Sequence, residues 1–254
     1  MDLLDLLQQV KSGLVSPQEA SAQLRYAPFE DLIAGVNLDL HRGLRTGQGE
    51  CVFAQGKSLE RLQSALLHLA GNKANQPVLA TRVNPEQGEA LLKTFPEGEY
   101  WAEARLFAIN RKLQLSPPWP RQGELMIITA GSSDLPVALE ALGSARFYGL
   151  EAGLAPDIGV AGIHRLRPWL KTLDKAKILM VIAGMEGALP SVMAGLTGKP
   201  VLAVPAGIGY GISSGGFAAL AAMLSSCAPG ISVFNIDNGY GAAVFAARML
   251  GQTR

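Results

Sequence analysis

Residues 178–196 read ILMVIAGMEGALPSVMAGL, and this segment indicates the fold class more clearly than any other part of the chain. Its first six residues are all apolar, which is typical of a strand that is buried on both faces of a parallel sheet. A glycine-containing loop follows, and the small and apolar residues of Leu189–Leu196 then predict a helix. The segment therefore predicts one strand–loop–helix unit of an α/β protein.

The same alternation of apolar strands and helices recurs throughout residues 124–254. Besides Ile178–Ala183, strands are predicted at Leu125–Ala130, Asp157–Ala161, Pro200–Val204 and Ile231–Ile236. Besides Leu189–Leu196, helices are predicted at Leu135–Tyr148, Leu166–Leu173, Phe217–Cys227 and Ala242–Leu250. We therefore expect a three-layer α/β domain, in which helices cover both faces of a parallel sheet of the flavodoxin or Rossmann type.

The first half of the chain has a different pattern. Leucines at helical spacing predict a helix near the N-terminus, and Ser16 and Ser58 are positioned to cap two further helices. Pro77–Arg82 is predicted as a strand, and another helix begins at Pro85. The proline-rich segment LSPPWPRQG, residues 115–123, is typical of an extended connector. We therefore expect a smaller domain at 1–121, with a helical arm and an α/β region, and the parallel α/β domain at 122–254.

The composition excludes several classes of protein. Of the 254 residues, 48% are hydrophobic and 17% are charged, and the formal net charge is only +1. An intrinsically disordered chain has fewer apolar residues and more net charge, and a dedicated nucleic-acid-binding protein has a basic excess. The two cysteines are too few for a disulfide scaffold and are compatible with a reducing compartment.

The mean hydropathy of +0.21 raises the question of a membrane protein. The longest apolar runs, such as Ile178–Met185 and Phe217–Leu224, are far shorter than the ~20 residues that span a bilayer. The N-terminal segment MDLLDLLQQVKSG has acidic residues where a signal peptide has basic ones. We therefore expect a cytoplasmic protein that binds neither membranes nor nucleic acids.

Polar residues follow each predicted strand of the C-terminal half. The loops contain GSSDLP, GIHR, GMEGALP, a glycine-rich run over 205–216, and DNGYG after the last strand. The carboxyl ends of parallel strands meet at one edge of a sheet, and ligands bind there. Ser133 and Asp134 can cap the next helix or hold a phosphate, and the two interpretations are compatible because helix N-termini bind phosphates.

Three residues in or near these loops are candidates for chemistry. Glu186 is a lone acid between an apolar strand and an apolar helix. Burial there would raise the pKa of the carboxyl group, which suits acid/base catalysis. The alternative is that Glu186 only accepts hydrogen bonds from loop amides. His164 is either a proton-transfer group or a capping or core histidine, and Cys227 is by itself most simply a small buried apolar residue. The two cysteines and three histidines lack the spacing of a metal site.

The loop sequences resemble two related families. GSSDLP at 131–136, HR at 164–165 and GISV at 230–233 resemble the PurE family of carboxylases, which move a carboxyl group on an aminoimidazole ribonucleotide. Glu186 and Cys227 do not belong to the PurE pattern. The longer strings VAGIHRL, VIAGMEGALPSV, GYGISSGG, SSCAPG and NIDNGYGA are instead similar to the LarB family of nickel-pincer nucleotide cofactor biosynthesis proteins. DLHRGLR at 39–45, GK at 56–57 and TRV at 81–83 extend this resemblance over nearly the whole chain.

The resemblance to LarB implies a specific reaction. Proteins of that family carboxylate the pyridinium ring of nicotinic acid adenine dinucleotide at carbon 5, with carbon dioxide as co-substrate, and hydrolyse the phosphoanhydride. The products are pyridinium-3,5-biscarboxylic acid mononucleotide and AMP, in the first step of nickel-pincer cofactor synthesis. The resemblance also implies a PurE-like C-terminal domain and a homo-oligomer, which is expected to be an octamer.

The resemblance assigns roles to particular residues. Cys227 is expected to be the nucleophile, Glu186 the acid/base and His164 a proton-handling group. Mg²⁺ is expected to bind mainly to the substrate phosphates, with Asp134 as a weak candidate ligand. For the hydrolysis, Asp237 and the N-terminal residues Asp39, His41 and Arg42 are further candidates. The residues expected to bind the substrate are Gly131, Ser132, Ser133, Asp134, Arg165, Gly184, Met185, Gly207, Gly209, Tyr210, Gly211, Ser214, Gly215, Asp237 and Asn238.

Two other functions remain open. A PurE-like aminoimidazole ribonucleotide carboxylase or mutase would need neither Cys227 nor Glu186. A non-catalytic nucleotide-binding domain would keep the phosphate-binding loops, but it would not need Cys227, Glu186 and His164 together at one edge of the sheet.

Overall fold

The computed structural model describes residues 3–26, 29–32, 36–40, 42–71 and 76–251. The C-terminal half is built on five parallel strands: β7 (Leu125–Thr129), β8 (Ala152–Ala155), β9 (Ile178–Ala183), β10 (Val201–Pro205) and β11 (Ile231–Val233). Their order across the sheet is β11-β10-β9-β7-β8, so the winding reverses between β7 and β9. The expected parallel α/β fold is confirmed. In doubly wound folds, ligands bind at such a reversal, outside the carboxyl ends of the strands.

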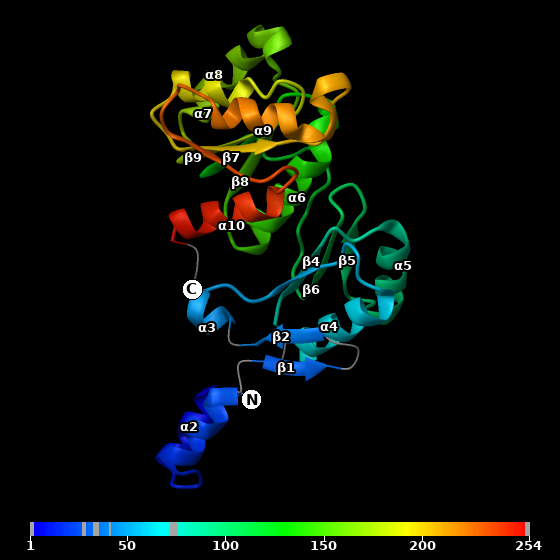
Figure 1. Cartoon of the computed structure of the whole chain (residues 1–254), viewed down its shortest axis with the longest axis vertical. Helices are drawn as coiled ribbons and strands as arrows, with labels where there is room; N and C mark the ends of the chain where they lie inside the picture. The colour runs from blue at the N-terminus through cyan, green and yellow to red at the C-terminus, as the bar shows by residue number, and fades with distance from the viewer. Residues whose placement is uncertain (1–2, 27–28, 33–35, 41, 72–75, 252–254) are drawn as a thin grey trace.

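Helices cover both faces of this sheet (Figure 1). On one face lie α6 (Leu135–Phe147) and α10 (Gly239–Met249), and on the other lie α7 (Leu170–Leu173), α8 (Leu189–Leu196) and α9 (Phe217–Leu224). Alternate residues of β9 enter two different cores: Ile178, Met180 and Ile182 pack with α6 and α10, and the residues between them pack with α8 and α9. This two-sided burial explains why the strand carries no polar residue.

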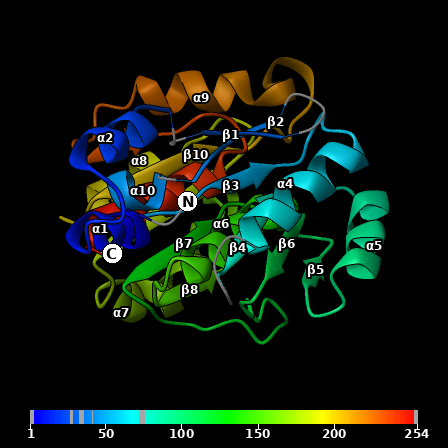
Figure 2. The same cartoon turned by 90° about the horizontal axis from the view of Figure 1, so that it is seen from below.

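α9 uses only one of its sides to cover the sheet. Ala219 and Met223 are buried, whereas Phe217 and Leu224 are 71% and 67% exposed. Figure 2 shows α9 as the outermost element on its side of the sheet. Large apolar side chains exposed in this way favour contact of this side of α9 with another molecule.

The first half contains a mixed sheet in the order β3-β4-β6-β5. Its strands are β3 (Cys51–Phe53), β4 (Val78–Thr81), β5 (Glu99–Trp101) and β6 (Leu106–Ile109). On one face, α4 (Leu59–Gly71) and α5 (Pro85–Thr94) form a core that includes Phe107. On the other face, Leu106 and Ala108 share a core with α6, so the two halves of the chain pack against each other. The predicted domain boundary between residues 121 and 122 falls in the connection from β6 to β7 and stays a prediction.

An N-terminal arm precedes this sheet. It consists of α1 (Leu3–Lys11), α2 (Pro17–Tyr26), the antiparallel strands β1 (Phe29–Leu32) and β2 (Val36–Asp39), and α3 (Arg42–Thr46). The N–H of Glu19 donates to the Ser16 hydroxyl at 3.1 Å, and the N–H of Ser16 donates to the Glu19 carboxylate at 2.8 Å. The predicted cap of α2 is therefore confirmed. Among the helices that the structure describes, none has the length and apolar character needed to cross a bilayer.

Several predicted elements differ from the structure in position or length. The strand predicted at Asp157–Ala161 is wrong, because β8 occupies Ala152–Ala155 and residues 157–161 follow it. The sequence of β8 is AGLA, whose small side chains fit a buried strand but have low strand propensity. The helix predicted at Phe217–Cys227 ends at Leu224. A 3-10 segment at Val160–Trp169 (η2) occupies the first half of the helix predicted at Leu166–Leu173, and α7 occupies the second half.

Candidate active site

A cavity of about 480 Å³ lies where β7, β8, β9 and β10 end, at their carboxyl ends. The loops that follow these four strands form its wall, so the predicted convergence of loops on one edge of the sheet is present. Glu186 lines the cavity. Of the residues predicted to bind substrate, those that line it are Gly131, Ser133, Asp134, Arg165, Gly184, Met185, Gly209 and Tyr210.

Asp134 organises the wall of this cavity. Its side chain is almost completely buried, and Oδ2 accepts a hydrogen bond from the N–H of Gly131 at 2.8 Å. Burial raises the pKa of Asp134, and the backbone N–H groups of Gly131, Ala130 and Gly184 act in the opposite direction. The carboxylate therefore ties the loop after β7 to the loop after β9. This contact favours a role in loop architecture over the predicted role as a magnesium ligand.

Close backbone packing shapes the loop after β9. A Cβ on Gly184 would lie 2.3 Å from the carbonyl oxygen of Ile208, in the loop after β10. Gly187 has φ +62°, and a Cβ there would lie 2.8 Å from the carbonyl oxygen of Ala219 in α9. Side chains at either position would push these segments apart. The two glycines therefore allow the loop to carry Glu186 to the cavity while packing against its neighbours.

An ion pair between two residues that follow β8 forms part of the cavity wall. Nη1 of Arg165 lies 2.7 Å from Oδ2 of Asp157, and both residues line the cavity. Asp157 adopts φ 57°, and its N–H donates to the hydroxyl of Thr129 at the end of β7. Sequence reasoning missed Asp157 because it assigned the residue to a strand. The signal that could have revealed it is a turn-forming Asp directly after a proline, followed by glycine two residues on.

Glu186 is exposed, and the expectation that it is buried is wrong for the single chain. The loop that carries it, GMEG, follows the end of β9, and Glu186 is both exposed and part of the cavity lining, which puts its carboxylate at the mouth of the cavity. His164 is also exposed. It belongs to the 3-10 segment η2 and does not line the cavity, although its neighbour Arg165 does.

Cys227 lies away from this cavity. It follows the C-terminal end of α9 and is exposed. The carbonyl of Gly230 accepts a hydrogen bond from the N–H of Val201, the first residue of β10, so this segment lies at the amino edge of the sheet. The hydroxyls of Ser226 and Ser191 are 2.7 Å apart and hold the segment against α8. The expectation that Cys227, Glu186 and His164 meet at one edge is therefore wrong within one chain.

Other residues predicted to bind substrate make local structural contacts. The N–H of Gly207 donates to Oδ1 of Asp237 at 2.7 Å, which ties the glycine-rich loop to the loop after β11. Asn238 caps α10, because its Oδ1 accepts a hydrogen bond from the N–H of Gly241 at 2.8 Å. The remaining predicted residues outside the cavity wall are Ser132, beside Ser133, and Gly211, Ser214 and Gly215 in the 3-10 segment Gly211–Gly216 (η3).

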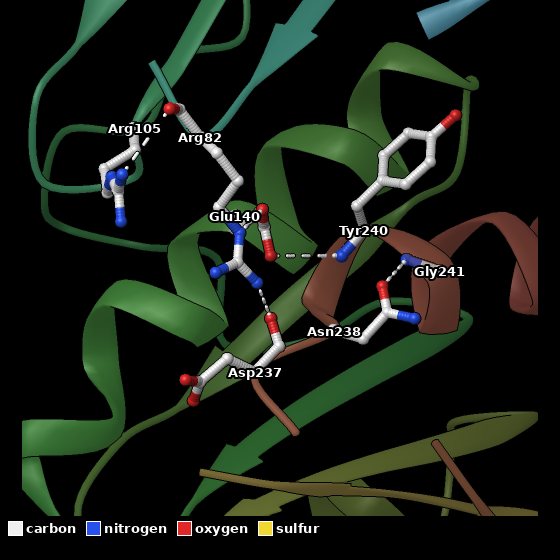
Figure 3. A network of polar contacts seen from close by, with 7 residues as sticks. All are labelled: Arg82, Arg105, Glu140, Asp237, Asn238, Tyr240 and Gly241. Carbon is white, nitrogen blue, oxygen red and sulfur yellow. Dashed lines mark hydrogen bonds and ion pairs between the residues drawn. The ribbon is translucent and has the colours of Figure 1, made fainter. Parts of the chain in front are cut away.

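A polar network joins the two halves of the chain beside the cavity (Figure 3). Arg82, which follows β4, donates from Nε to Oε1 of Glu140 on α6 at 2.9 Å and from Nη2 to the backbone carbonyl of Asp237. Oε2 of Glu140 accepts a hydrogen bond from the N–H of Tyr240 at 3.3 Å. Burial raises the pKa of Glu140, and the charge of Arg82 opposes this rise. The network positions the loop after β11 against the N-terminal sheet.

Cys51 lies in the same contact region between the halves. Burial raises the pKa of its thiol to about 12. The hydroxyls of Tyr148 and Tyr240 are 2.9 Å apart, and burial raises the pKa of both phenols. Cys51 therefore remains a protonated thiol at neutral pH and is a poor nucleophile.

No group of three or more His, Cys, Asp or Glu side chains that could hold a metal ion occurs within the described part of the chain. Of the N-terminal candidates for hydrolysis, His41 lies outside the described residues, while Asp39 ends β2 and Arg42 begins α3.

The sequence matches known families over both halves. Residues 29–112 match the LarB/PurE-like N-terminal domain, and residues 124–254 match AIR carboxylase. An uncharacterized protein of Methanocaldococcus jannaschii is 39% identical over 254 residues, which cover 96% of this chain and 95% of that protein. The N5-carboxyaminoimidazole ribonucleotide mutase of the same organism is 35% identical over 50% of this chain and 78% of its own length. That of Pyrococcus horikoshii is 36% identical over 49% of this chain and 71% of its own length.

Proposed function

This chain belongs to the family of carboxylase-type proteins that join a LarB/PurE-like N-terminal domain to an AIR carboxylase domain. From that premise we propose that it carboxylates carbon 5 of the pyridinium ring of nicotinic acid adenine dinucleotide and hydrolyses the phosphoanhydride. The observation that carries the proposal is the carboxyl-edge cavity with Glu186 at its mouth, in a chain that also has the LarB-type N-terminal domain.

The cavity has features that suit a nucleotide with an aromatic base. Its volume of about 480 Å³ is within the ~300–1,000 Å³ range of pockets that bind small molecules. Its wall combines apolar residues such as Leu189 and Ile208 with the hydroxyl of Ser133 and the guanidinium of Arg165. A pyridinium ring can pack on the apolar part, while the polar groups bind ribose hydroxyls and phosphate oxygens.

The chemistry requires a nucleophile and a base. A pyridinium ring is electron-poor, so its carbon 5 does not attack carbon dioxide directly. A thiolate that adds to an adjacent ring carbon converts the ring to an enamine, and carbon 5 then forms the bond to carbon dioxide. Loss of the carbon 5 proton to a base and expulsion of the thiolate restore the aromatic ring, with no net oxidation or reduction. Cys227 supplies the thiolate and Glu186 accepts the proton in this proposal.

The placement of Cys227 gives the proposal a structural consequence. The thiol lies at the amino edge of the sheet and Glu186 at the carboxyl edge, so a thiol from a second copy of the chain must reach the cavity. The exposed apolar residues Phe217, Leu224 and Ile212 support contact between copies, since Ile212 is 94% exposed and the other two are more than half exposed. We therefore propose a homo-oligomer, and specifically an octamer, with active sites at the contacts between chains.

We also propose that Mg²⁺ and carbon dioxide bind together with the substrate. The described carboxylates do not form a magnesium cage, since Asp134 is buried and bonded to the backbone and Asp157 is paired with Arg165. A magnesium ion held by substrate phosphates and water would neutralise phosphate charge, and no step of the proposal uses the metal. His164 keeps its proposed proton-handling role only if contact between copies brings it to a cavity.

A second candidate is the mutase or carboxylase reaction on an aminoimidazole ribonucleotide. The two relatives named as N5-carboxyaminoimidazole ribonucleotide mutases favour it, and so does the separation of Cys227 from the cavity in one chain. This reaction needs no thiol, so loss of Cys227 would leave it intact.

Product analysis distinguishes the candidates. The protein is incubated with nicotinic acid adenine dinucleotide, Mg²⁺ and carbon-13 bicarbonate, and the products are identified by mass. The proposal expects AMP together with a pyridinium mononucleotide that is heavier by one labelled carboxyl group. AMP without a labelled ring would identify a hydrolase. Turnover of an aminoimidazole ribonucleotide, with the dinucleotide unchanged, would establish the second candidate.

A further inference from the structure

A second cavity, of about 170 Å³, lies between the two halves of the chain. Ser133 and Ile208 line both this cavity and the larger one, so the two are neighbours. The smaller cavity also exposes two arginines of the N-terminal half, Arg82 and Arg105, and the carboxylate-bearing Asp237 of the C-terminal half. The N-terminal half therefore contributes charged groups beside the predicted site.

The two arginines differ in what they contact. The guanidinium of Arg82 donates hydrogen bonds to the carboxylate of Glu140 and to the backbone carbonyl of Asp237. Arg105 makes only a weak contact, from Nη2 to the carbonyl of Arg82 at 3.4 Å, and it forms no ion pair with any described carboxylate. Figure 3 shows the two arginines next to each other, with only Arg82 directed at Glu140 and Asp237. Arg105 therefore lines the cavity with no described carboxylate within ion-pair distance of its guanidinium.

The backbone at both arginines is in an unfavourable conformation. Arg82 has φ 57° and Arg105 has φ 52°, in the left-handed region that residues with a Cβ avoid. The N–H of Val83 donates to the carbonyl of Arg105 at 2.9 Å, which holds the two strained positions together. Strain of this kind is concentrated at ligand-binding and catalytic sites, because it places side chains where a relaxed backbone would not.

We infer that this cavity binds the ribose 5′-phosphate unit of the AMP half of the substrate, with Arg105 as the group that binds the phosphate. The inference rests on the proposed function, which places the pyridinium ring beside Glu186 in the larger cavity. The phosphates then extend past Ser133 into the smaller cavity. A guanidinium binds phosphate oxygens through two parallel hydrogen bonds, and the carboxylate of Asp237 can accept a hydrogen bond from a ribose hydroxyl. The cavity is smaller than the ~300 Å³ at which pockets for whole ligands begin, which fits a ribose phosphate but leaves the adenine outside.

Binding of AMP to the full chain tests the inference without catalysis. Calorimetry compares wild type with Arg105→Gln, Arg105→Lys and the matched control Arg167→Gln, an exposed arginine that lines neither cavity. We expect Arg105→Gln to weaken AMP binding at least about tenfold, Arg105→Lys to restore part of it, and Arg167→Gln to leave it unchanged. Adenosine, which lacks the phosphate, is expected to bind wild type and Arg105→Gln equally.

The result that overturns the inference is AMP affinity within about twofold of wild type in a folded Arg105→Gln variant, or a wild type that does not bind AMP. Failure of the proposed function looks different. If no labelled ring product forms while Arg105→Gln still loses AMP affinity, the phosphate subsite stands and the reaction at the larger cavity is another one. If the labelled product forms and Arg105→Gln keeps both its AMP affinity and its KM for the dinucleotide, only the subsite is wrong.

Discussion

Nε of Arg82 and Oε1 of Glu140 lie 2.9 Å apart, and this ion pair joins the loop after β4 to helix α6 across the contact between the two halves of the chain. The Glu140 side chain is 5% exposed and that of Arg82 is 21% exposed. Removing the carboxylate of Glu140 leaves the guanidinium of Arg82 largely buried without its counter-charge. We therefore expect Glu140→Gln to lower the free energy of unfolding by about 2–3 kcal/mol. Urea unfolding measures this change.

The matched control is Glu124→Gln, which removes a more exposed ion pair with Lys177. The Lys177 side chain is 64% exposed, so this substitution is expected to cost less than about 1 kcal/mol. Equal losses in the two variants would show that the pair between the halves contributes no more than a surface pair.

Gly184 and Gly195 offer a matched pair of glycine substitutions. A Cβ at Gly184 would meet the carbonyl oxygen of Ile208, whereas one at Gly195 in α8 would meet nothing within 4 Å. Gly184→Ala is therefore expected to displace the loops of the larger cavity, lower nucleotide affinity at least about tenfold and cost about 1–3 kcal/mol of stability. Gly195→Ala is expected to leave affinity unchanged and to stabilise the helix by up to ~1 kcal/mol. Similar affinities in the two variants would contradict the packing described for Gly184.

The two cysteines are expected to differ in reactivity. Near pH 8 the thiolate fraction of Cys51 is on the order of one in ten thousand, because its pKa is raised to about 12. Cys227 is exposed. Iodoacetamide followed by peptide mass spectrometry should therefore label Cys227 first and leave Cys51 unmodified in the folded protein. Labelling of Cys51 at a comparable rate would show that its region opens readily to solvent.

The raised pKa of Cys51 also predicts that the stability of the protein depends on pH. Its folded-state pKa lies above the ordinary value of 9.0, so its contribution to stability is present below about pH 9 and is lost as the pH rises toward about 12. Between these limits, the free energy of unfolding of Cys51→Ala should therefore fall less than that of wild type. The raised phenol pKa values of Tyr148 and Tyr240 account for the fall that remains. Parallel slopes in unfolding experiments on the two proteins would contradict the assignment.

The elements that could be predicted from sequence are those whose buried residues form a run of large apolar side chains. β7, β9 and α6 lie at the positions that their apolar runs indicate, and the loops after them converge as the parallel topology requires. β8 could not be found in this way, because its AGLA sequence is buried without being strongly apolar. Misplacing that strand also hid Asp157, which follows it and lines the cavity.

The parts that sequence did not reveal depend on contacts distant along the chain. Arg82 and Glu140 are 58 residues apart, and no local pattern links them. The position of Cys227 follows from α9, which runs from the carboxyl edge back to the amino edge of the sheet and carries the cysteine away from Glu186. A motif alone does not show which edge of a sheet its residues reach.

The central claim is that Cys227 of one copy and Glu186 of another complete each active site. Cys227→Ala and Glu186→Gln are expected to be inactive separately in the formation of the labelled carboxylated ring. The two variants are then co-expressed with different tags, and mixed oligomers are isolated. With random assembly, about a quarter of the sites receive an intact Cys227 from one copy and an intact Glu186 from another, so activity should return to at most about a quarter of the wild-type value. Mixed oligomers of Cys227→Ala with Cys227→Ser serve as the control without an intact thiol. Mixed Cys227→Ala and Glu186→Gln oligomers that stay inactive would contradict the claim.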